Sequence, residues 1–520
     1  MTPSSASWPL GPSPNLLRDP WIPVRDLDGD VTMIGLRDLL GRASQLAEIA
    51  TGHGPTDAAL TILACAIVGS ADIAKNAKER RAILTAGRLP DVVDAYLKKW
   101  EAKFDLASPH GGFLQAIADQ VTGVKRGNPS RTLFADTNVD DDFKMYRPPS
   151  HRRISWHEAA RALVERNLFD LGGPVSSWIP PAPSKDGSHG IGGVAATTMI
   201  VYAVGQNFLE TLILNAPKRD AGDAPSWEEP PTVGIRTERR SGPLRSMTAR
   251  ARTTLLEYDD AGNVNAIVFG AGTSFEGPQV LQSARFVLAY INPKGEVRYP
   301  KMDIGRGTWG ACHMAFLTNE ASKARLTLIE NAKMYTDDDR AVIPLRFVGY
   351  ATNKKLVEFV HLEEFIIPRS LMADPTGSHA ALLSVADYAR KAINAGVSVL
   401  KEATLNAPSK FKASHASEDF KARCYEIVAR RFQDLVDSIS DVVGDKRQER
   451  VRTWARNVIA EIGSEVAEVL LTLDDARKYA EGMNTYPLFA MHDDLFSPKE
   501  RAERAERKIK RVQKETIKKA

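Results

Sequence analysis

The chain has 520 residues, of which 43% are hydrophobic and 26% are charged, and its formal net charge is +4 at pH 7. This length allows roughly two to four domains with cores of their own, and the composition is typical of a globular protein. No apolar run approaches the ~20 residues that span a bilayer, and the Pro/Ser-rich start lacks the basic and apolar regions of a signal peptide. We therefore expect a cytoplasmic protein without a membrane span.

The chain starts with an arm, residues 1–14, after which alternating apolar residues predict a β-hairpin. Residues 21–24 fit its first strand, Asp28-Gly29 is a strong turn signal, and residues 31–34 fit the returning strand. Residues 55–70 then predict a buried helix, because apolar side chains occur on nearly all of its sides.

The three cysteines and the basic residues narrow the class of protein further. Cys65, Cys312 and Cys424 are far apart and lack the spacing of a disulfide framework or a zinc site, so we expect them in the core. Lysine and arginine concentrate at 125–153, at 236–252 and near the C-terminus. Any attraction to nucleic acid would therefore come from local patches.

Residues 123–153 are polar and rich in turn formers, which predicts a long exposed loop. Within it, Phe134 has basic neighbours such as Arg131, and an aromatic side chain in such surroundings can stack on a base. Packing of Phe134 against its own domain is the alternative. The aspartate runs at 140–142 and 337–339 lack the spaced oxygen ligands of a calcium or magnesium loop, so we interpret both as solvated charge.

A proline-rich stretch gives way to glycines between residues 172 and 193. Glycine carries no Cβ, so the main chain there can come within hydrogen-bond reach of a ligand. The residues able to do so, or to add charge and polarity, are Lys185, Gly187, Ser188, His189, Gly190, Gly192 and Gly193. This combination suits a phosphate or the edge of a nucleic-acid groove, with a ligand-free surface loop as the alternative. Residues 195–215 behind it are expected to form an amphipathic helix.

The middle of the chain predicts antiparallel strands. Residues 253–258, 264–269 and 285–291 alternate like the strands of a meander. The glycines of the segment Gly305–Gly310 follow a GxGxxG spacing, with Glu330 about twenty residues on, which is also the fingerprint of a dinucleotide-binding site. The upstream pattern is antiparallel and no βαβ repeat follows, so we do not favour that interpretation.

Residues 345–350 and 356–360 predict a second hairpin, and its tip carries Asn353, Lys354 and Lys355. Two lysines at a tip often serve solubility only. The alternative is a wedge or a phosphate contact held on rigid strands.

The rest of the chain predicts helices with apolar stripes, at 376–404, 416–440, 445–473 and 497–518. Four such helices with short links indicate a four-helix bundle. We thus expect an α+β protein, with a large mixed N-terminal domain of antiparallel strands and helices (15–370) followed by an all-α four-helix bundle (371–520).

Several motifs resemble one known family. They are NLLRDPWIPV with its following Asp-Gly turn, TLFADTN, GIGG, the hairpin tip after VGY and the helical C-terminal region. Together they are similar to the CasA family, the large subunits of the type I-E Cascade CRISPR surveillance complex. The resemblance covers nearly the whole chain, and the opening block is its most specific part. It implies a non-catalytic subunit without cofactor or metal that works in antiviral defence with the other Cascade subunits and guide RNA. Such a subunit recognises the short motif beside the target (the PAM) in double-stranded DNA, helps to open the duplex and recruits a separate helicase-nuclease.

The resemblance also assigns residues. It implies that 185–193 lies along the minor groove, where a degenerate pattern is read. Asn353, Lys354 and Lys355 would form the wedge that enters the duplex beside the motif. Phe134, with Arg131 and Asn138, would lie in the loop that docks toward the 5′ end of the guide RNA and a neighbouring subunit.

Two departures from the family bear on DNA binding. Lys354 and Lys355 stand where the family can have a glutamine, so phosphate attraction would replace amide contacts. No lysine occurs from 219 to 293 to supply the family's lysine finger, which leaves Arg245, Arg250 or Arg285 as substitutes. The alternative function is a nucleotide-dependent oxidoreductase that uses Gly305–Gly310.

Overall fold

The computed structural model divides the chain into two units. Unit 1 comprises Met1–Ile304 and Met314–Pro375, and unit 2 comprises Gly305–His313 and Thr376–Ala520. The structure describes residues 8–108, 110–117, 126–129, 154–174, 189–190, 192–229, 236–238, 242–275, 284–302, 307–317, 326–336, 341–353, 356–404 and 413–471.

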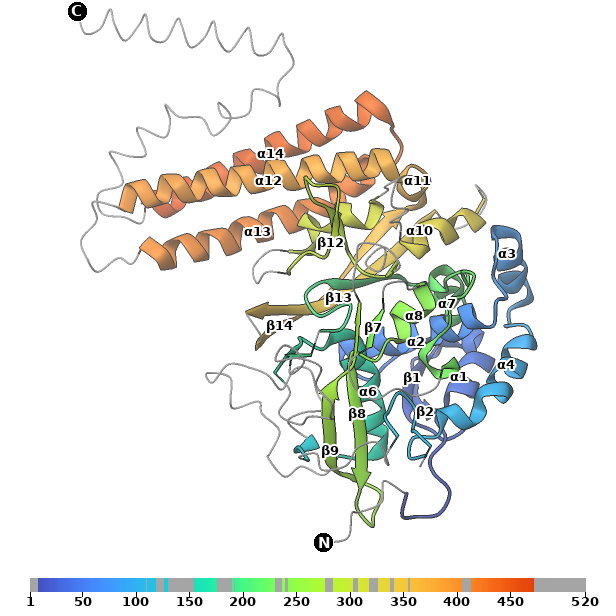
Figure 1. Cartoon of the computed structure of the whole chain (residues 1–520). Helices are drawn as coiled ribbons and strands as arrows, with labels where there is room; N and C mark the ends of the chain where they lie inside the picture. Colours follow the sequence, from blue (N-terminus) through green and yellow to red (C-terminus); the bar gives the residue numbers. More distant parts are fainter. Residues whose placement is uncertain are drawn as a thin grey trace, which may run out of the picture. The chain divides into compact units, whose positions relative to one another are not determined.

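Unit 1 mixes helices with small, mostly antiparallel sheets (Figure 1). Its described α-helices are α1 (Leu36–Gly41), α2 (Gly54–Ser70), α3 (Ala77–Ala86), α4 (Val92–Trp100), α6 (Trp156–Phe169), α7 (Phe208–Asn215), α8 (Pro243–Thr248), α10 (Thr327–Asn331) and α11 (Arg369–Ala373). Single 3₁₀ turns occur at η1 (Ala43–Gln45), η2 (Glu101–Phe104), η7 (Ser226–Glu228) and η10 (Ala332–Met334). The α+β class that the sequence predicts is confirmed.

The predicted N-terminal hairpin is confirmed. Strands β1 (Ile22–Asp26) and β2 (Val31–Ile34) pair antiparallel, and β3 (Leu46–Ile49) pairs with the other edge of β1. Gly29 has φ 98° in the turn, a conformation that glycine adopts without strain.

Helix α2 is the buried helix that residues 55–70 predict. It starts at Gly54 with proline in its first turn, and it contacts α6, α7 and α8. Its apolar side chains are buried on all sides, which explains why the sequence shows no polar face. Helices α6, α7 and α8 therefore all pack against one internal helix.

A three-stranded antiparallel sheet, in the order β14-β13-β6, holds the second predicted hairpin. Strands β13 (Val342–Asn353) and β14 (Leu356–Pro368) pair along their whole length, and β6 (Met199–Ala203) pairs with β13. The prediction of one amphipathic helix over 195–215 is wrong. That segment forms strand β6, a break, and then α7.

A separate hairpin pairs β8 (Arg252–Tyr258) with β9 (Val264–Ala271), which confirms two strands of the predicted meander. The third predicted strand, 285–291, does not join them. Only its end forms β11 (Tyr290–Ile291), which pairs with β12 (Val297–Arg298). Two further short pairs are β4 (Gly173–Pro174) with β5 (His189–Gly190), and β7 (Arg236–Glu238), which runs parallel to β10 (Thr273–Phe275).

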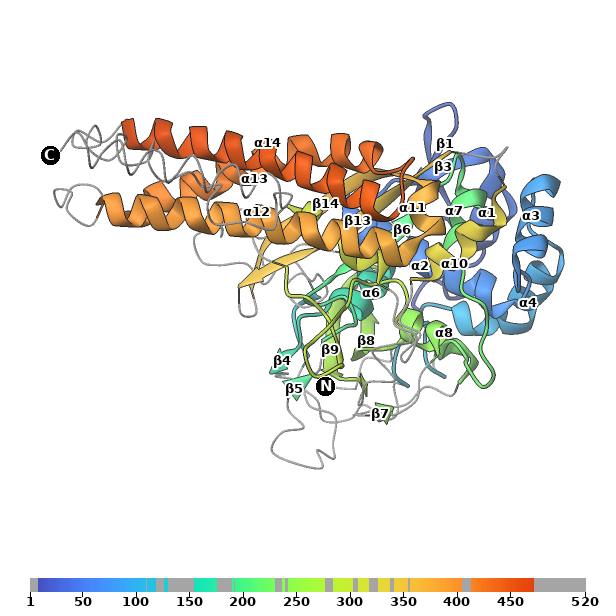
Figure 2. The ribbon, with the colours of Figure 1, turned by 90° about the horizontal axis from the view of Figure 1, so that it is seen from above.

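Unit 2 contains the long helices α12 (Pro375–Thr404), α13 (Ala413–Ser438) and α14 (Gly444–Leu471), which run alongside one another in Figure 2. The 3₁₀ turns η8 (Thr308–Gly310) and η9 (Cys312–Phe316) come from the segment around the unit boundary. A Cβ on Gly396 would lie 2.5 Å from Phe420 Cζ and 3.0 Å from Val466 Cγ2, so this glycine lets α12 approach both neighbours. The fourth predicted helix, 497–518, lies outside the described residues.

The three cysteines are buried and unbridged, as predicted. Among the helices that the structure describes, none combines the length and hydropathy of a bilayer-crossing segment.

Candidate nucleic-acid interface

The described ends of the glycine segment pair with each other as a two-residue antiparallel ribbon. Gly173 pairs with Gly190 and Pro174 with His189. His189 and Gly190 are thus placed by their backbone, whereas the predicted site residues Lys185, Gly187 and Ser188 lie outside the described part of the chain.

The two glycines at the end of this segment have a packing role of their own. A Cβ on Gly193 would lie 2.2 Å from the carbonyl oxygen of Leu168, and one on Gly192 would lie 2.6 Å from that of Asp170. Both carbonyls belong to the C-terminal end of α6. Close approach of two backbones therefore requires glycine here, independently of any DNA contact.

Asp170 ends α6 and contacts both stems of the segment. Its Oδ1 accepts a hydrogen bond from the Gly172 amide at 2.7 Å, and its main-chain oxygen accepts one from the Gly193 amide at 2.8 Å. The same carboxylate forms ion pairs with Arg166 Nε at 2.6 Å and with Arg252 NH2 at 2.7 Å. We call Arg166, Asp170 and Arg252 the loop clamp.

The loop clamp is buried, since the side chains of Asp170 and Arg252 are 1% and 3% exposed. Burial by itself would raise the pKa of the Asp170 carboxyl, but Arg166 and Arg252 lower it below its ordinary value. Both guanidinium groups also lie over the ring of Phe269, at 4.7 and 5.1 Å from its centroid. The carboxylate is therefore charged and held between two cations.

The hairpin tip continues the β13–β14 pairing. Asn353 pairs with Leu356, and the predicted wedge residues Lys354 and Lys355, which connect these positions, lie outside the described residues.

The same sheet connects the glycine segment with the hairpin. Met199, the first residue of β6, pairs with Gly349, four residues before Asn353. At ~3.3 Å per residue the end of β13 lies roughly 13 Å further along, and Gly193 lies within roughly 20 Å of Met199 by chain length. Chain length therefore limits the distance between Gly193 and Asn353, the described ends of the two predicted DNA-binding segments, to roughly 33 Å, which is about one turn of duplex DNA.

A buried polar cluster links α6 to this sheet. Glu165 on α6 accepts hydrogen bonds from Thr56 Oγ1 and from the Tyr350 hydroxyl, each at 2.6 Å, and His53 Nδ1 lies 3.4 Å from its carboxylate. Burial by itself would raise the pKa of Glu165, but these three partners lower it below its ordinary value. Because Tyr350 is on β13, the cluster fixes the helix that precedes the glycine segment against the hairpin.

The described ends of the predicted partner loop pair with strand β9. Gly127 pairs with Ile267 and Ile154 pairs with Val264, both on β9, so the two ends of the segment between them meet one strand. Arg131, Phe134 and Asn138 themselves lie outside the described residues, as do the aspartate runs at 140–142 and 337–339.

The arginines considered in place of a lysine finger are engaged within the protein. Arg245 is 8% exposed and pairs with Glu229, Arg250 donates to the Gln115 carbonyl at 3.2 Å, and Arg285 lies 3.7 Å from Asp220. Each of the three arginines thus has a partner within the protein. The side chain of Arg285 is 35% exposed, whereas Arg245 is buried.

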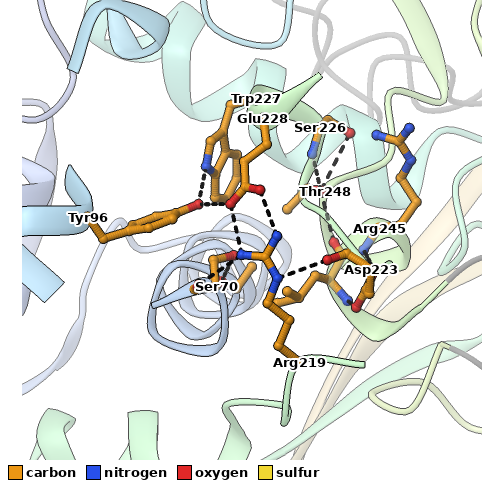
Figure 3. A network of polar contacts seen from close by, with 11 residues as sticks. Ser70, Tyr96, Arg219, Asp223, Ser226, Trp227, Glu228, Arg245 and Thr248 are labelled. Atoms are coloured by element: carbon orange, nitrogen blue, oxygen red, sulfur yellow. Dashed lines mark hydrogen bonds and ion pairs between the residues drawn. The ribbon is translucent and has the colours of Figure 1, made fainter. Parts of the chain in front are cut away.

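Nearby, a further arginine organises a structural network (Figure 3). Arg219 contacts both Glu228 oxygens, at 2.7 and 3.1 Å, and the Ser70 carbonyl at 3.0 Å. Tyr96 on α4 donates to Glu228 at 2.7 Å and accepts from Trp227 Nε1 at 2.8 Å. This network joins α2, α4 and the segment before α8.

The described residues around Gly307 do not form a dinucleotide site. The strand before them, β12, belongs to an antiparallel pair, and Gly307 is followed by a 3₁₀ turn instead of a long helix. Among the residues that the structure describes, no group of three or more His, Cys, Asp or Glu side chains could hold a metal ion.

Comparison with known proteins agrees with this architecture. The structure of Thermus thermophilus CasA (Cse1) has a TM-score of 0.75 and 20% identity, with 92% of this chain and 99% of that chain covered. Thermobifida fusca Cse1 has a TM-score of 0.74 and 21% identity, covering 93% and 98%. A chain of a CRISPR RNA-guided surveillance complex has a TM-score of 0.68 and 18% identity, covering 91% and 99%. A search of curated proteins gave no significant match.

Sequence missed the loop clamp, because Asp170 and Arg252 are 82 residues apart and neither lies in a recognisable motif. A signal was present in Asp170-Leu-Gly-Gly directly after an amphipathic helix.

The family itself is established by sequence, since the family described as CRISPR-associated protein Cse1 matches residues 15–462. The chain therefore belongs to the Cse1 family of CRISPR-associated proteins.

Proposed function

We propose that this chain is the large subunit of a Cascade-type CRISPR RNA-guided surveillance complex and that it reads a short motif in double-stranded DNA. It makes and breaks no covalent bond. Its partners are the other subunits, the guide RNA, the target duplex and a helicase-nuclease. Family membership and the fold shared with a chain of a surveillance complex support the assembly.

One observation carries the DNA-reading part. Gly193, at the end of the glycine segment, is six residues before β6, which pairs with β13, and chain length keeps it within roughly 33 Å of Asn353. Their separation suits two contacts on one duplex, a backbone contact in the minor groove and a wedge beside it. Base pairing with the guide RNA would then read the remaining sequence, as in another CRISPR effector.

The wedge is tested by replacing Asn353, Lys354 and Lys355 with alanine in the assembled complex. Strand opening, followed with a fluorescent base analogue, should slow by more than initial duplex binding weakens. The matched control is Lys98→Ala with Lys99→Ala on α4, which removes two lysines outside the sheet.

The salt dependence of duplex affinity reports how many phosphate contacts the two lysines make, whereas the rate of strand opening reports the wedge. Two lysines that contact phosphates contribute up to about 1.8 to the slope of log affinity against log salt concentration. We expect that slope to fall in the tip variant and to persist in the α4 control. Equal strand-opening rates in the tip variant and the parent would remove the wedge role.

A nucleotide-dependent oxidoreductase is not favoured by the antiparallel surroundings of Gly307. Calorimetric titration with NAD tests it directly, and saturable binding would revive it.

A further inference from the structure

We propose that Asp170 is a positioning residue for DNA-motif recognition and that Arg252 acts through it. The proposal rests on the proposed function and adds a mechanism to it. Asp170 itself does not contact DNA in this scheme. It fixes the two described stems of the glycine segment, at Gly172 and at Gly193.

The geometry singles out this residue because it contacts both stems at once. The side chain of Asp170 accepts a hydrogen bond from the Gly172 amide on the first stem. Its backbone oxygen accepts a hydrogen bond from the Gly193 amide on the second stem. A rotation of Asp170 therefore shifts both stems together. Leu168 adds another bond to the second stem, by accepting the Ala195 amide at 2.9 Å.

Charge fixes the orientation of the Asp170 carboxylate. Its two oxygens are divided between Arg166 on the same helix and Arg252 on β8, each within 2.7 Å. Arg252 is 2% exposed, and its Nε and NH1 atoms have no hydrogen-bond partner in the structure. Its NH2 atom donates a hydrogen bond to Asp170 Oδ1 at 2.7 Å. A buried charge with so few partners holds that partner firmly, because moving away would leave the charge unpaired.

The clamp also connects the glycine segment to the strand pair with which the described ends of the predicted partner loop pair. Arg252 lies on β8, Phe269 beneath both guanidinium groups lies on β9, and β5 contacts β9. The described ends of the glycine segment are therefore held against the same hairpin with which Gly127 and Ile154 pair. A reading segment needs such a fixed base, because hydrogen bonds to base edges weaken steeply when donor and acceptor move apart or out of line.

The experiment compares Asp170→Ala, Asp170→Asn and Arg252→Lys with the parent. Alanine removes the acceptor for Gly172 and the counter-ion, asparagine keeps an acceptor without the charge, and lysine keeps the charge without the planar fork. Glu228→Gln is the matched control, because it also removes the carboxylate charge from a partly buried arginine pair in unit 1, with Arg219, that includes neither stem. Each variant is examined as full chain and in the complete complex.

The first readout is hydrogen exchange of backbone amides in the full chain without DNA. We expect faster exchange at Gly172 and Gly193 in the Asp170 variants, with the asparagine variant between the parent and the alanine variant. Amides of α2 should be unchanged. This measurement does not depend on the proposed function, and unchanged exchange at both glycines would overturn the positioning role.

The second readout is the ratio of affinities for duplexes with and without the motif. We expect a roughly tenfold loss of this ratio, the size of one lost base-pair contact, with non-specific affinity within about twofold of the parent. Glu228→Gln should keep the ratio. A parent complex that shows no discrimination would refute the proposed function instead, and an equal loss in Glu228→Gln would reduce the clamp to a general stability effect. If the alanine variant does not fold, Asp170→Asn and Arg252→Lys decide the question.

Discussion

Tyr350→Phe should lower the free energy of unfolding of unit 1 by ~1.5 to 3 kcal/mol. The Tyr350 hydroxyl is buried and donates to Glu165 Oε1 at 2.6 Å, while its ring packs edge-on against Phe169 with centroids 5.4 Å apart. Phenylalanine keeps the ring packing and removes only the hydroxyl. The Glu165 carboxylate then loses one hydrogen bond to a charged group in a buried site.

For a unit of this size, that loss corresponds to a fall in Tm of ~2 to 4 °C, because the unfolding entropy grows with the number of residues. Scanning calorimetry at pH 7 measures the shift. Tyr290→Phe is the control, since the Tyr290 side chain lies on the surface of the same unit at 38% exposure. Its effect should stay within about 0.5 kcal/mol.

The pH dependence tests the charge on Glu165. Since the folded-state pKa of Glu165 is lowered from 4.5, its stabilisation is complete above pH 4.5 and is lost as the pH falls through the folded-state value. The cost of Tyr350→Phe should therefore shrink below pH 4.5. A cost under about 0.5 kcal/mol at pH 7, or one that stays constant with pH, would refute the reasoning.

Two further predictions concern a glycine and a histidine. Gly193→Ala should destabilise unit 1 by ~1 to 3 kcal/mol, because the new Cβ would lie 2.2 Å from a backbone oxygen that cannot rotate away. Urea titration measures this loss. In the same titration Gly41→Ala should be neutral or stabilising, because no atom lies within 4 Å of a Cβ at that position. Burial, followed by the neighbouring His379, lowers the pKa of His313 from 6.5 to about 4, so unit 2 should lose stability as the pH falls from 6.5 to 4. The loss approaches ~3 kcal/mol, urea unfolding at several pH values measures it, and an identical pH profile in His313→Gln would contradict the assignment.

Local signals predicted the elements that have strong periodicity. The Asp28-Gly29 turn, the buried helix α2 and the long hairpin β13–β14 are found where the sequence places them. The three described helices of unit 2 follow their apolar stripes to within a few residues at each end. In each case the local preference and the tertiary environment agree.

The segment after Gly193 was predicted wrongly because it is apolar throughout. Met199–Ala203 is buried on both faces, so it shows no alternation that would distinguish a strand from a helix. Asn207 supplied the missing signal. Its side chain caps α7 by accepting the Glu210 amide, and a cap at that position excludes a helix that runs through it from residue 195.

The candidate site was predictable only in part. Glycine content indicated where the main chain is approached closely, and the structure shows that for Gly192 and Gly193 the approaching group is α6. Sequence alone does not show the loop clamp, since an ion pair between Asp170 and Arg252 depends on how β8 packs beside α6. Contacts between residues far apart in sequence carry no local pattern.

The bridges on β9 have a consequence for how such proteins diversify. Gly127 and Ile154 meet β9 at Ile267 and Val264, positions roughly 10 Å apart along the strand. Lengthening a closed segment costs only about 0.6 kcal/mol for each doubling of its length. Evolution can therefore change the sequence and length of residues 128–153 while Gly127 and Ile154 keep their pairing with β9. Changes in the choice of partner need not disturb the glycine segment, whose base is secured by separate residues.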